Sequence, residues 1–317
     1  MLTVAYVGTL AHHIEHDVPI LYGDASLCLA LPGCGPYGEP GVYTQNGQNV
    51  YGTLVGAIDN QTISPNYHNS AGGPVTAFAE SEYVQNSGNS NYNSLQVSAE
   101  RRARDVTYLL SYTYAKSLDD VGALWDPRDP LRNYGQSSWD MRHNFVASYN
   151  WSLPFAHFLG PHRYTDGWQI TGISRFNTGF PVNLASGGDA ALTNIALDYP
   201  NQVAPLQKLN PRALGHAYFN TSAFASNLSC GFEVCGVTGS AKQYLFHGPG
   251  TINTDMGVEK DTKITERTAL NLRIEMFNVF NHANFTDVIG NANSSQFGQA
   301  TNTASARIGQ ISGKFIF

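Results

Sequence analysis

Eight segments of this chain alternate between apolar and polar side chains with a period of two residues. A period of two places successive side chains on opposite faces of a β-strand, so each segment predicts a strand with one apolar and one polar face. The segments span residues 2–10, 92–102, 106–114, 142–153, 168–176, 252–259, 269–280 and 309–317. Most approach the nine to eleven residues that a tilted strand needs to cross a bilayer. The chain is therefore expected to be all-β, with about eight strands.

The connections between these segments alternate strictly between long and short. The long connections are residues 11–91, 116–140, 177–250 and 281–303, and the short ones are 103–105, 154–167 and 260–267. Long loops on one side and short turns on the other are typical of outer-membrane barrels, whose long loops are extracellular and whose short turns are periplasmic. A Greek-key sandwich does not require this asymmetry. The predicted fold is an antiparallel transmembrane β-barrel segment.

The alternation also predicts which side chains face lipid. The apolar series are Val106, Tyr108, Leu110, Tyr112 and Tyr114, and Leu270, Leu272, Ile274 and Met276. Trp139, Trp151 and Trp168 lie near strand ends, where an interfacial aromatic belt would place them. Core packing in a β-sandwich is the alternative explanation for the tryptophans.

The composition fits this fold and excludes other classes. Charged residues make up 13% of the chain, against roughly 25% in an average globular protein. No run of about 18 apolar residues occurs, so transmembrane helices are not expected. The net charge of −6 argues against a nucleic-acid partner. A secreted β-sandwich would have a similar composition and stays open as an alternative.

The last nine residues form an alternating segment that ends on an aromatic side chain. Gly309, Ile311, Gly313, Phe315 and Phe317 share one face. This pattern resembles the C-terminal signal by which the outer-membrane assembly machinery recognises bacterial β-barrels. The closing strand of an ordinary sandwich is the alternative.

Four cysteines form two local pairs, Cys28 with Cys34 and Cys230 with Cys235. Five residues separate the first pair and no histidine cluster accompanies either, which disfavours zinc. Two small disulfides in outward loops are predicted, and they imply an oxidising compartment. Four reduced thiols are the alternative.

Charged residues on the polar strand faces are the candidates for a functional site in the lumen. They are Glu100, Arg102, Arg175, Arg273 and Glu275. In a transporter such groups would hold a plug or line the solute path. The alternative is a solvated ladder of ion pairs that contribute about 0–1 kcal/mol each.

Two clusters were weighed as metal sites. His12, His13 and His16 follow the first strand, and a solvated loop edge is preferred there to a zinc site. The acidic loop with Asp119, Asp120, Asp126 and Asp129 lacks the EF-hand spacing, so a polar loop is preferred to a calcium site. No metal and no cofactor is expected.

No catalytic motif occurs. The chain has no nucleophile elbow, no His-Glu-x-x-His zinc motif, no phosphate loop and no dinucleotide fingerprint. The expectation is that the protein is not an enzyme.

Several short blocks resemble the Oar-like TonB-dependent receptors of acidobacteria, in the order in which that family carries them. The blocks are residues 88–97, 110–119, 140–145, 167–170 with 179–181, 219–224, 248–250 and 273–285. The resemblance implies a barrel of the 22-stranded transporter type with a plugged lumen. It also implies a carboxypeptidase-regulatory-like domain, a TonB box and a plug, and residues 1–317 contain none of these.

Residues 1–10 have no basic region, no continuous apolar stretch and no cleavage site, so they do not form a signal peptide. We therefore expect residues 1–317 to be the C-terminal barrel portion of a longer receptor in the bacterial outer membrane. The partners that follow are membrane lipid, the barrel assembly machinery, the plug-bearing remainder of the receptor, TonB and an unknown solute. The expected function is substrate binding or uptake. A small self-closing pore or adhesin is one alternative, and a secreted carbohydrate-binding β-sandwich is another.

Overall fold

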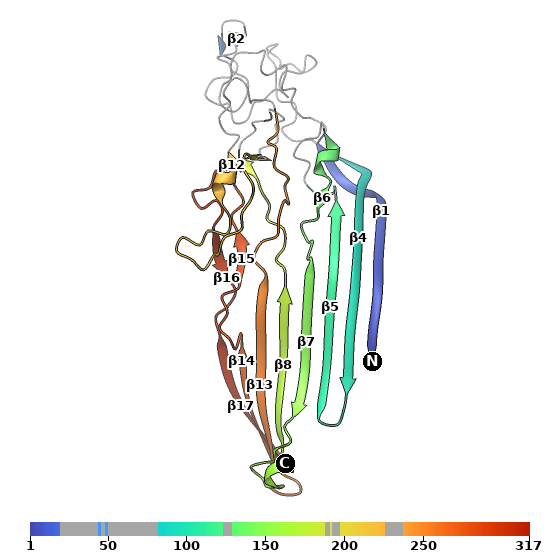
Figure 1. The fold of residues 1–317 in the computed structure, drawn as a ribbon, viewed down its shortest axis with the longest axis vertical. Helices are drawn as coiled ribbons and strands as arrows, with labels where there is room; N and C mark the ends of the chain where they lie inside the picture. Colours follow the sequence, from blue (N-terminus) through green and yellow to red (C-terminus); the bar gives the residue numbers. More distant parts are fainter. Residues whose placement is uncertain are drawn as a thin grey trace.

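The protein is built around one antiparallel sheet. A computed structural model describes residues 1–19, 44–45, 48–49, 82–122, 129–187, 191, 197–225 and 237–317. Eight long strands follow one another in the sheet in the order β1-β4-β5-β7-β8-β13-β14-β17, and the short β6 pairs with β5. Strands that are neighbours in this order are also neighbours along the chain, so the sheet is an up-and-down meander (Figure 1). The predicted fold class is confirmed.

The eight long strands have the bounds β1 Leu2–Pro19, β4 Glu82–Arg102, β5 Val106–Asp119, β7 His143–Ser152, β8 Trp168–Asn177, β13 Thr251–Lys263, β14 Ala269–Phe277 and β17 Ile308–Ile316. The short strands are β2 Thr44–Gln45, β3 Gln48–Asn49, β6 Gly135–Gln136, β9 Ser186–Gly187, β10 Leu197–Asp198, β11 Asn201–Gln202, β12 Phe224–Ala225, β15 Phe285–Val288 and β16 Ala300–Thr303. The helical turns are α2 Phe155–Leu159, η3 Pro130–Asn133 and η4 Thr221–Ala223. Among the described residues, no helix is long and apolar enough to cross a membrane.

The strand register joins the predicted apolar residues into one continuous face. Tyr112 pairs with Val97 on one side and with Phe145 on the other. Phe145 pairs with Phe176, and Phe176 pairs with Ile252. Directly paired residues point to the same side of a sheet. The face that carries Leu110 and Leu272 is therefore apolar across all eight strands, and the opposite face carries the polar series.

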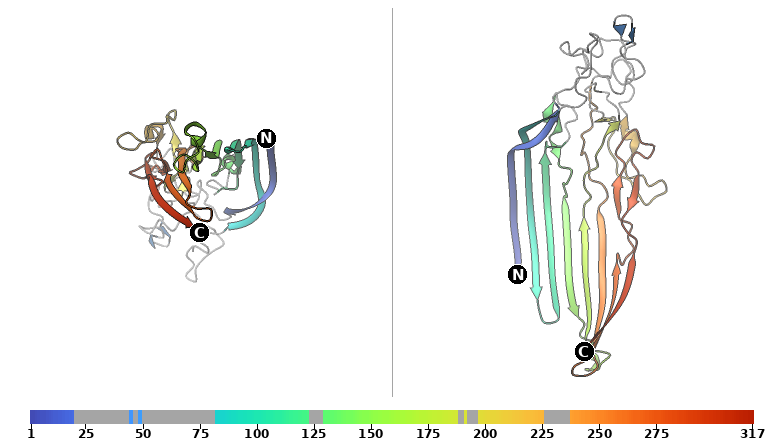
Figure 2. Two further views of the ribbon diagram at one scale, coloured as in Figure 1. Left: turned by 90° about the horizontal axis from the view of Figure 1, so that it is seen from below. Right: turned by 180° about the vertical axis from the view of Figure 1, so that it is seen from behind.

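The sheet is curved into an open trough. Seen from below, the strands form an arc, and both chain ends lie near the short turns (Figures 1 and 2). Within the described residues no pairing joins β1 to β17, so each edge strand has one unpaired side. Residues 103–105 and 264–268 turn at the end that holds the termini. The described parts of the long connections lie at the other end, in agreement with the predicted alternation of long and short connections.

The first hairpin differs from the prediction. We expected a strand over residues 2–10 and an irregular tract from residue 11 to residue 91. Instead β1 continues to Pro19 and pairs with β4 from Glu82 onward, with a bulge at His13, whose φ is 58°. The alternation is lost where His12 and His13 stand side by side, because a bulge shifts the face that each side chain occupies. The second predicted loop also starts later, because β5 extends to Asp119.

The long connections build an apolar core beyond the end of the sheet. Its buried members are Val182, Leu184, Tyr218, Phe219, Ala223, Phe224, Ala241 and Phe246, and Leu206, Leu245, Val288 and Phe297 pack against them. Phe219 is 1% exposed and contacts Phe246 and Phe297 edge to face, with ring centres 5.1 and 5.2 Å apart. We call this cluster the loop core. It joins residues 178–250 to residues 278–307, two connections that are separate in sequence.

Candidate functional site

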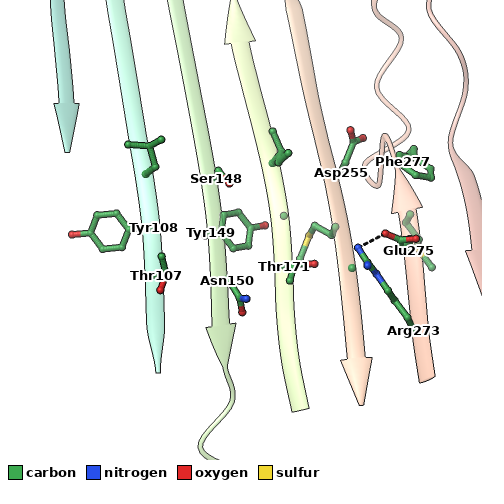
Figure 3. A pocket seen from close by; sticks show the side chains of 16 residues that line it. Thr107, Tyr108, Ser148, Tyr149, Asn150, Thr171, Asp255, Arg273, Glu275 and Phe277 are labelled. Atoms are coloured by element: carbon green, nitrogen blue, oxygen red, sulfur yellow. Dashed lines mark ion pairs between the residues drawn. The ribbon is translucent and has the colours of Figure 1, made fainter. Parts of the chain in front are cut away.

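The concave face of the sheet carries the polar series together with Leu109, Ile173 and Phe277; we call this face the polar wall, and two adjoining hollows lie along it. The first has a volume of about 450 Å³ and reaches from Thr107 on β5 to Glu275 on β14. The second has a volume of about 550 Å³ and is lined by Arg175 on β8 and Asn253 on β13. Both are lined by Ile173, Asp255 and Phe277, so they continue into each other. Figure 3 shows the side chains of β5, β7, β8, β13 and β14 that line the first hollow.

Arg273 and Glu275 form an ion pair at one side of the first hollow. Arg273 Nη2 lies 2.5 Å from Glu275 Oε1, and 42% of the Arg273 side chain is exposed (Figure 3). Gln310 Nε2 of β17 donates to the other oxygen of Glu275 at 2.5 Å. A pair exposed to this degree contributes only about 0–1 kcal/mol to stability. Stability alone therefore gives little reason for these charges.

Asp255 stands where the two hollows meet. Its Oδ1 accepts a hydrogen bond from Asn253 Nδ2 at 2.9 Å and another from the backbone N–H of Asn278 at 2.8 Å. The second bond holds the chain directly after the end of β14. The backbone leaves the extended conformation there, since Asn278 has a positive φ of 50°. Asp255 thus holds Asn253 and Asn278 in position and places its carboxylate in both hollows.

The predicted lumen-facing charges occupy one face, in two groups. Arg175, Arg273 and Glu275 line the two hollows directly. Glu100 and Arg102 form a separate ion pair on β4, with Arg102 Nε 2.5 Å from Glu100 Oε1. Their register partners on β5 are Leu109 and Thr107, which line the first hollow. The second group therefore adjoins the opposite edge of the same wall.

Our candidate list omitted four polar residues of the wall. Glu259 and Asp261 on β13 both accept from the Asn271 side chain of β14, at 2.7 Å in the case of Asp261. Together with Asp255 they extend the acidic part of the wall toward the short turns. The period of two already places Asp255, Glu259 and Asn271 on polar strand faces, whereas Asp261 lies beyond residue 259, where the predicted strand ended; β13 continues to Lys263.

The three histidines and Asp119 lie in strands rather than in the loops that we expected, whereas Asp120 and Asp129 lie outside the strands as predicted. His12, His13 and His16 are part of β1, so their assignment to a loop edge was wrong. His12 Nδ1 lies 2.7 Å from Asn89 Oδ1 on the paired strand. Asp119 is buried at the end of β5, and Asp120 accepts two hydrogen bonds from Asn89. Within the described ranges, no group of three or more His, Cys, Asp or Glu side chains could hold a metal ion.

Other predicted residues can be placed only in part. Asp126 and the cysteines Cys28, Cys34, Cys230 and Cys235 lie outside the described residues. The terminal series from Gly309 to Phe315 is in β17, where Ile311 pairs with Ile274 and Phe315 with Leu270 on the apolar face, and Phe317 follows the end of the strand. Trp151 and Trp168 lie at the short-turn ends of β7 and β8, and Trp139 lies at the long-loop end between β6 and β7.

A buried carboxylate that the sequence did not single out fastens the loops to the sheet. The Asp140 side chain is 0% exposed and accepts from the Ser117 backbone N–H at 2.6 Å. Its Oδ2 also lies 3.1 Å from Arg142 Nη2 and 2.8 Å from His247 Nε2. These contacts join β5, the start of β7 and the third long connection. Asp140 belongs to block 140–145, which resembles the receptor family. Its contacts with Ser117, Arg142 and His247 give an aspartate at this position a structural role.

This chain is similar to known outer-membrane proteins in sequence pattern and in fold. The model of the family described as the outer membrane beta barrel domain matches residues 1–310. No curated protein matches the chain in sequence. Among solved structures, the chain is similar to the outer membrane transporter YddB from Escherichia coli, with a TM-score of 0.45 and 10% identity. That match covers 99% of this chain and 30% of the transporter, so the chain spans about a third of the length of that protein.

The family match covers nearly the whole described sheet, including the polar wall and the apolar face. It confirms the predicted location in the bacterial outer membrane, and the chain belongs to the family of the outer membrane beta barrel domain.

Proposed function

We propose that this chain forms part of the barrel wall of a TonB-dependent receptor of the Oar-like type, which binds a solute and takes it up across the outer membrane. The polar wall would face the lumen, where its charges contact a plug domain or line the solute path. The remaining partners are membrane lipid, the assembly machinery, the plug-bearing part of the receptor and TonB. The proposal includes no catalytic step.

The observation that carries the proposal is the open trough with its hollow polar wall. An eight-stranded barrel that closes on itself has an interior just wide enough for its own side chains to fill. Here β1 and β17 each keep an unpaired side among the described residues, and the concave face has hollows of about 450 and 550 Å³. A wider barrel uses the unpaired edges for further strands and leaves room for a plug.

The ordered blocks that resemble the receptor family support the same proposal. Several of them fall at fastening points of this fold. Two asparagines of the block 273–285 bind backbone groups. Asn284 accepts from the Ile252 N–H of β13, and Asn278 donates to the carbonyl oxygens of His282 and Ser305. Asp140, in the block 140–145, fastens the third connection to β5. Matching residues at such points are what a shared barrel wall requires.

Cysteine pairs across the two sheet edges test the barrel size. Thr3 and Ala5 of β1 and Gln310 and Ser312 of β17 lie on the concave face. In each double variant, one residue of β1 and one of β17 are replaced by cysteine in a background without the four natural cysteines. Residues paired directly across a closed junction of β1 and β17 would lie within the 4.4–6.8 Å Cα separation of a disulfide, and the four combinations of these positions sample that junction. We expect no pair to crosslink in outer membranes. Crosslinking in high yield would establish a small closed pore and refute the receptor.

Uptake by cells tests the transport itself. Cells that carry the protein in its natural gene context would be compared for depletion of solutes from a mixed medium, with and without a protonophore. We expect one class of solute to be depleted only in energised cells, and less so for Arg273→Gln combined with Glu275→Gln. Lys263→Gln combined with Glu266→Gln changes the same charges at the short turns and should leave depletion unchanged. Depletion that persists in de-energised cells would mean a passive pore.

A further inference from the structure

A third hollow lies on the opposite, convex side of the sheet, at its long-loop end. It has a volume of about 490 Å³ and is lined by His143, Phe176 and Ile252 of the sheet and by Lys208, Tyr218 and His247 of the third long connection. We call it the rim cavity. Phe176 and Ile252 are register partners on the apolar face, and they are 41% and 46% exposed. The floor of the rim cavity therefore belongs to the surface that contacts lipid.

The height of the rim cavity can be estimated from the strand that supports it. Trp168 begins β8 at the short-turn end, and Phe176 lies eight residues further along the same strand. At about 3.3 Å per residue this distance is about 26 Å, or about 20 Å along the membrane normal for a tilt of about 40°. The apolar band of an outer-membrane barrel is about 25 Å tall and is flanked by aromatic girdles. With Trp168 at the periplasmic boundary, Phe176 lies about 5 Å below the extracellular boundary, and the residues of the third long connection extend the rim cavity from there toward the lipid headgroups.

Lys208 brings a cation to this boundary. Its Nζ donates to the His247 carbonyl oxygen at 2.8 Å and lies 5.7 Å from the centre of the Tyr218 ring. An ammonium has three N–H donors, so two remain for a ligand. None of the carboxylates in the described part of the chain forms an ion pair with Lys208. Partial burial beside the loop core lowers the pKa of Lys208, and a nearby anion would counteract that effect.

His143 adds a second polar group next to the apolar floor. It is exposed, its Nδ1 lies 2.8 Å from Tyr112 Oη, and its ring centre lies 5.1 Å from that of Tyr114. The opposite wall is held in place by the Tyr218 hydroxyl, which donates to the His247 carbonyl oxygen at 2.9 Å, and by the contact of His247 with Asp140. The rim cavity thus combines a rigid polar edge with an apolar floor.

We propose that the rim cavity binds the phosphorylated headgroup of an outer-leaflet lipid. The phosphate would accept hydrogen bonds from Lys208, and the acyl chains would lie along Phe176 and Ile252. Charge complementarity and the position at the headgroup boundary select this occupant over a soluble anion, which would make no use of the apolar floor. Basic pockets at the membrane boundary are known to bind anionic headgroups. This site is separate from the polar wall, so it does not depend on the proposed transport.

Native mass spectrometry of the detergent-extracted protein tests the site directly. The probe is bisphosphorylated lipid A, and its fully dephosphorylated form is the comparison. Charged hydrogen bonds contribute about 1.5–3 kcal/mol, so Lys208→Gln should weaken lipid A binding by about tenfold or more. Lys208→Arg should retain binding. Lys242→Gln removes an exposed lysine from the same connection and should leave the affinity unchanged.

Three outcomes would overturn the proposal, provided that the variants remain resistant to SDS at room temperature as folded barrels do. One is equal affinity for lipid A and its dephosphorylated form, because the phosphate would then have no role. Another is an affinity of Lys208→Gln equal to that of the unmodified protein. The third is displacement of lipid A by millimolar inorganic phosphate, which would identify a site for free anions.

Discussion

At the scale of single residues, side chains that are adjacent in sequence lie in different environments, one facing lipid and the next facing the concave side of the sheet. Leu110 and Ser111 are adjacent in β5, but Leu110 pairs with Ala99 and Ala147 on the apolar face, whereas Ser111 pairs with Ser98 and Val146 on the concave face. Because side chains alternate strictly along a strand, a change at one of these positions tests lipid contact and a change at the other tests the lumen.

Leu110→Arg should therefore impair the protein much more than Ser111→Arg. An arginine on the lipid face near the bilayer midplane costs about 2–4 kcal/mol, whereas the concave face already accommodates Arg175 and Arg273. Urea titration of both variants refolded into lipid vesicles measures the difference in unfolding free energy. Equal losses would mean that the two faces are assigned incorrectly.

Asp140→Asn should loosen the third long connection from the sheet. Removal of one partner from a buried ion pair costs about 3–5 kcal/mol, and here Arg142 and His247 would both lose the carboxylate. Hydrogen exchange of residues 237–250 should rise strongly. Asp129→Asn changes an exposed aspartate in the second long connection, which also holds Asp140; it is the control and should leave this exchange unaltered.

At the scale of elements, the strands and the connections are stabilised by different means. The strands are joined by backbone hydrogen bonds and have few fully buried side chains, because their apolar face is directed to lipid. The long connections instead bury aromatic side chains against one another, as a water-soluble domain does. A substitution in the loop core should therefore affect the loops and spare the sheet.

Phe219→Ala tests this separation. Truncation of a buried phenylalanine costs about 3–5 kcal/mol, so the connections should become sensitive to protease added outside intact cells. Leu214→Ala is the control, because Leu214 is fully exposed and its truncation should change stability by less than about 0.5 kcal/mol. Loss of the folded barrel along with the loops would show that the two parts are not independent.

At the scale of the whole molecule, both chain ends point toward the short-turn end, on opposite edges of the trough (Figures 1 and 2). Phe317 is 94% exposed and pairs with no strand. It therefore adds little to the stability of the folded sheet. We propose instead that Phe317 is recognised by the assembly machinery, as the resemblance of residues 309–317 to the C-terminal signal implies.

Phe317→Ala should accordingly reduce assembly while it leaves stability nearly unchanged. We expect the amount of protein in the outer membrane to fall several-fold, while the refolded variant unfolds within about 0.5 kcal/mol of the unmodified protein. Quantitative blotting of outer-membrane fractions and urea titration check the two halves of this prediction. An unchanged membrane level would argue against a signal at residues 309–317.

The strands were predictable because lipid and water impose a local pattern. In β14 the alternation of Leu272 and Arg273 is visible in the sequence alone, and it correctly gave the faces. The first hairpin was predicted too short because a bulge at His13 breaks the period of two. A local pattern cannot show on which side of such a break the pairing resumes.

The loop core and the fastening at Asp140 were not predictable by the same method. Phe219 and Phe297 lie far apart in sequence and share no period, so only tertiary packing brings them together. The rim cavity likewise combines β8, β13 and the third connection. The charges of the polar wall were partly foreseen, since Arg273 and Glu275 follow the strand period, but the meeting of the two hollows at Asp255 depends on the curvature of the sheet.

The loop core also bears on how such a chain could be threaded across its membrane. Outside the cell there is no nucleotide to drive the passage of long hydrophilic segments. Each buried phenylalanine or leucine contributes about 1.5–3 kcal/mol, and the loop core packs described parts of residues 178–250 against residues 278–307, so it can form only once both segments are on the same side of the membrane. Formation of the loop core would make the passage irreversible, because a segment that is packed into the core cannot return across the membrane without losing these contacts.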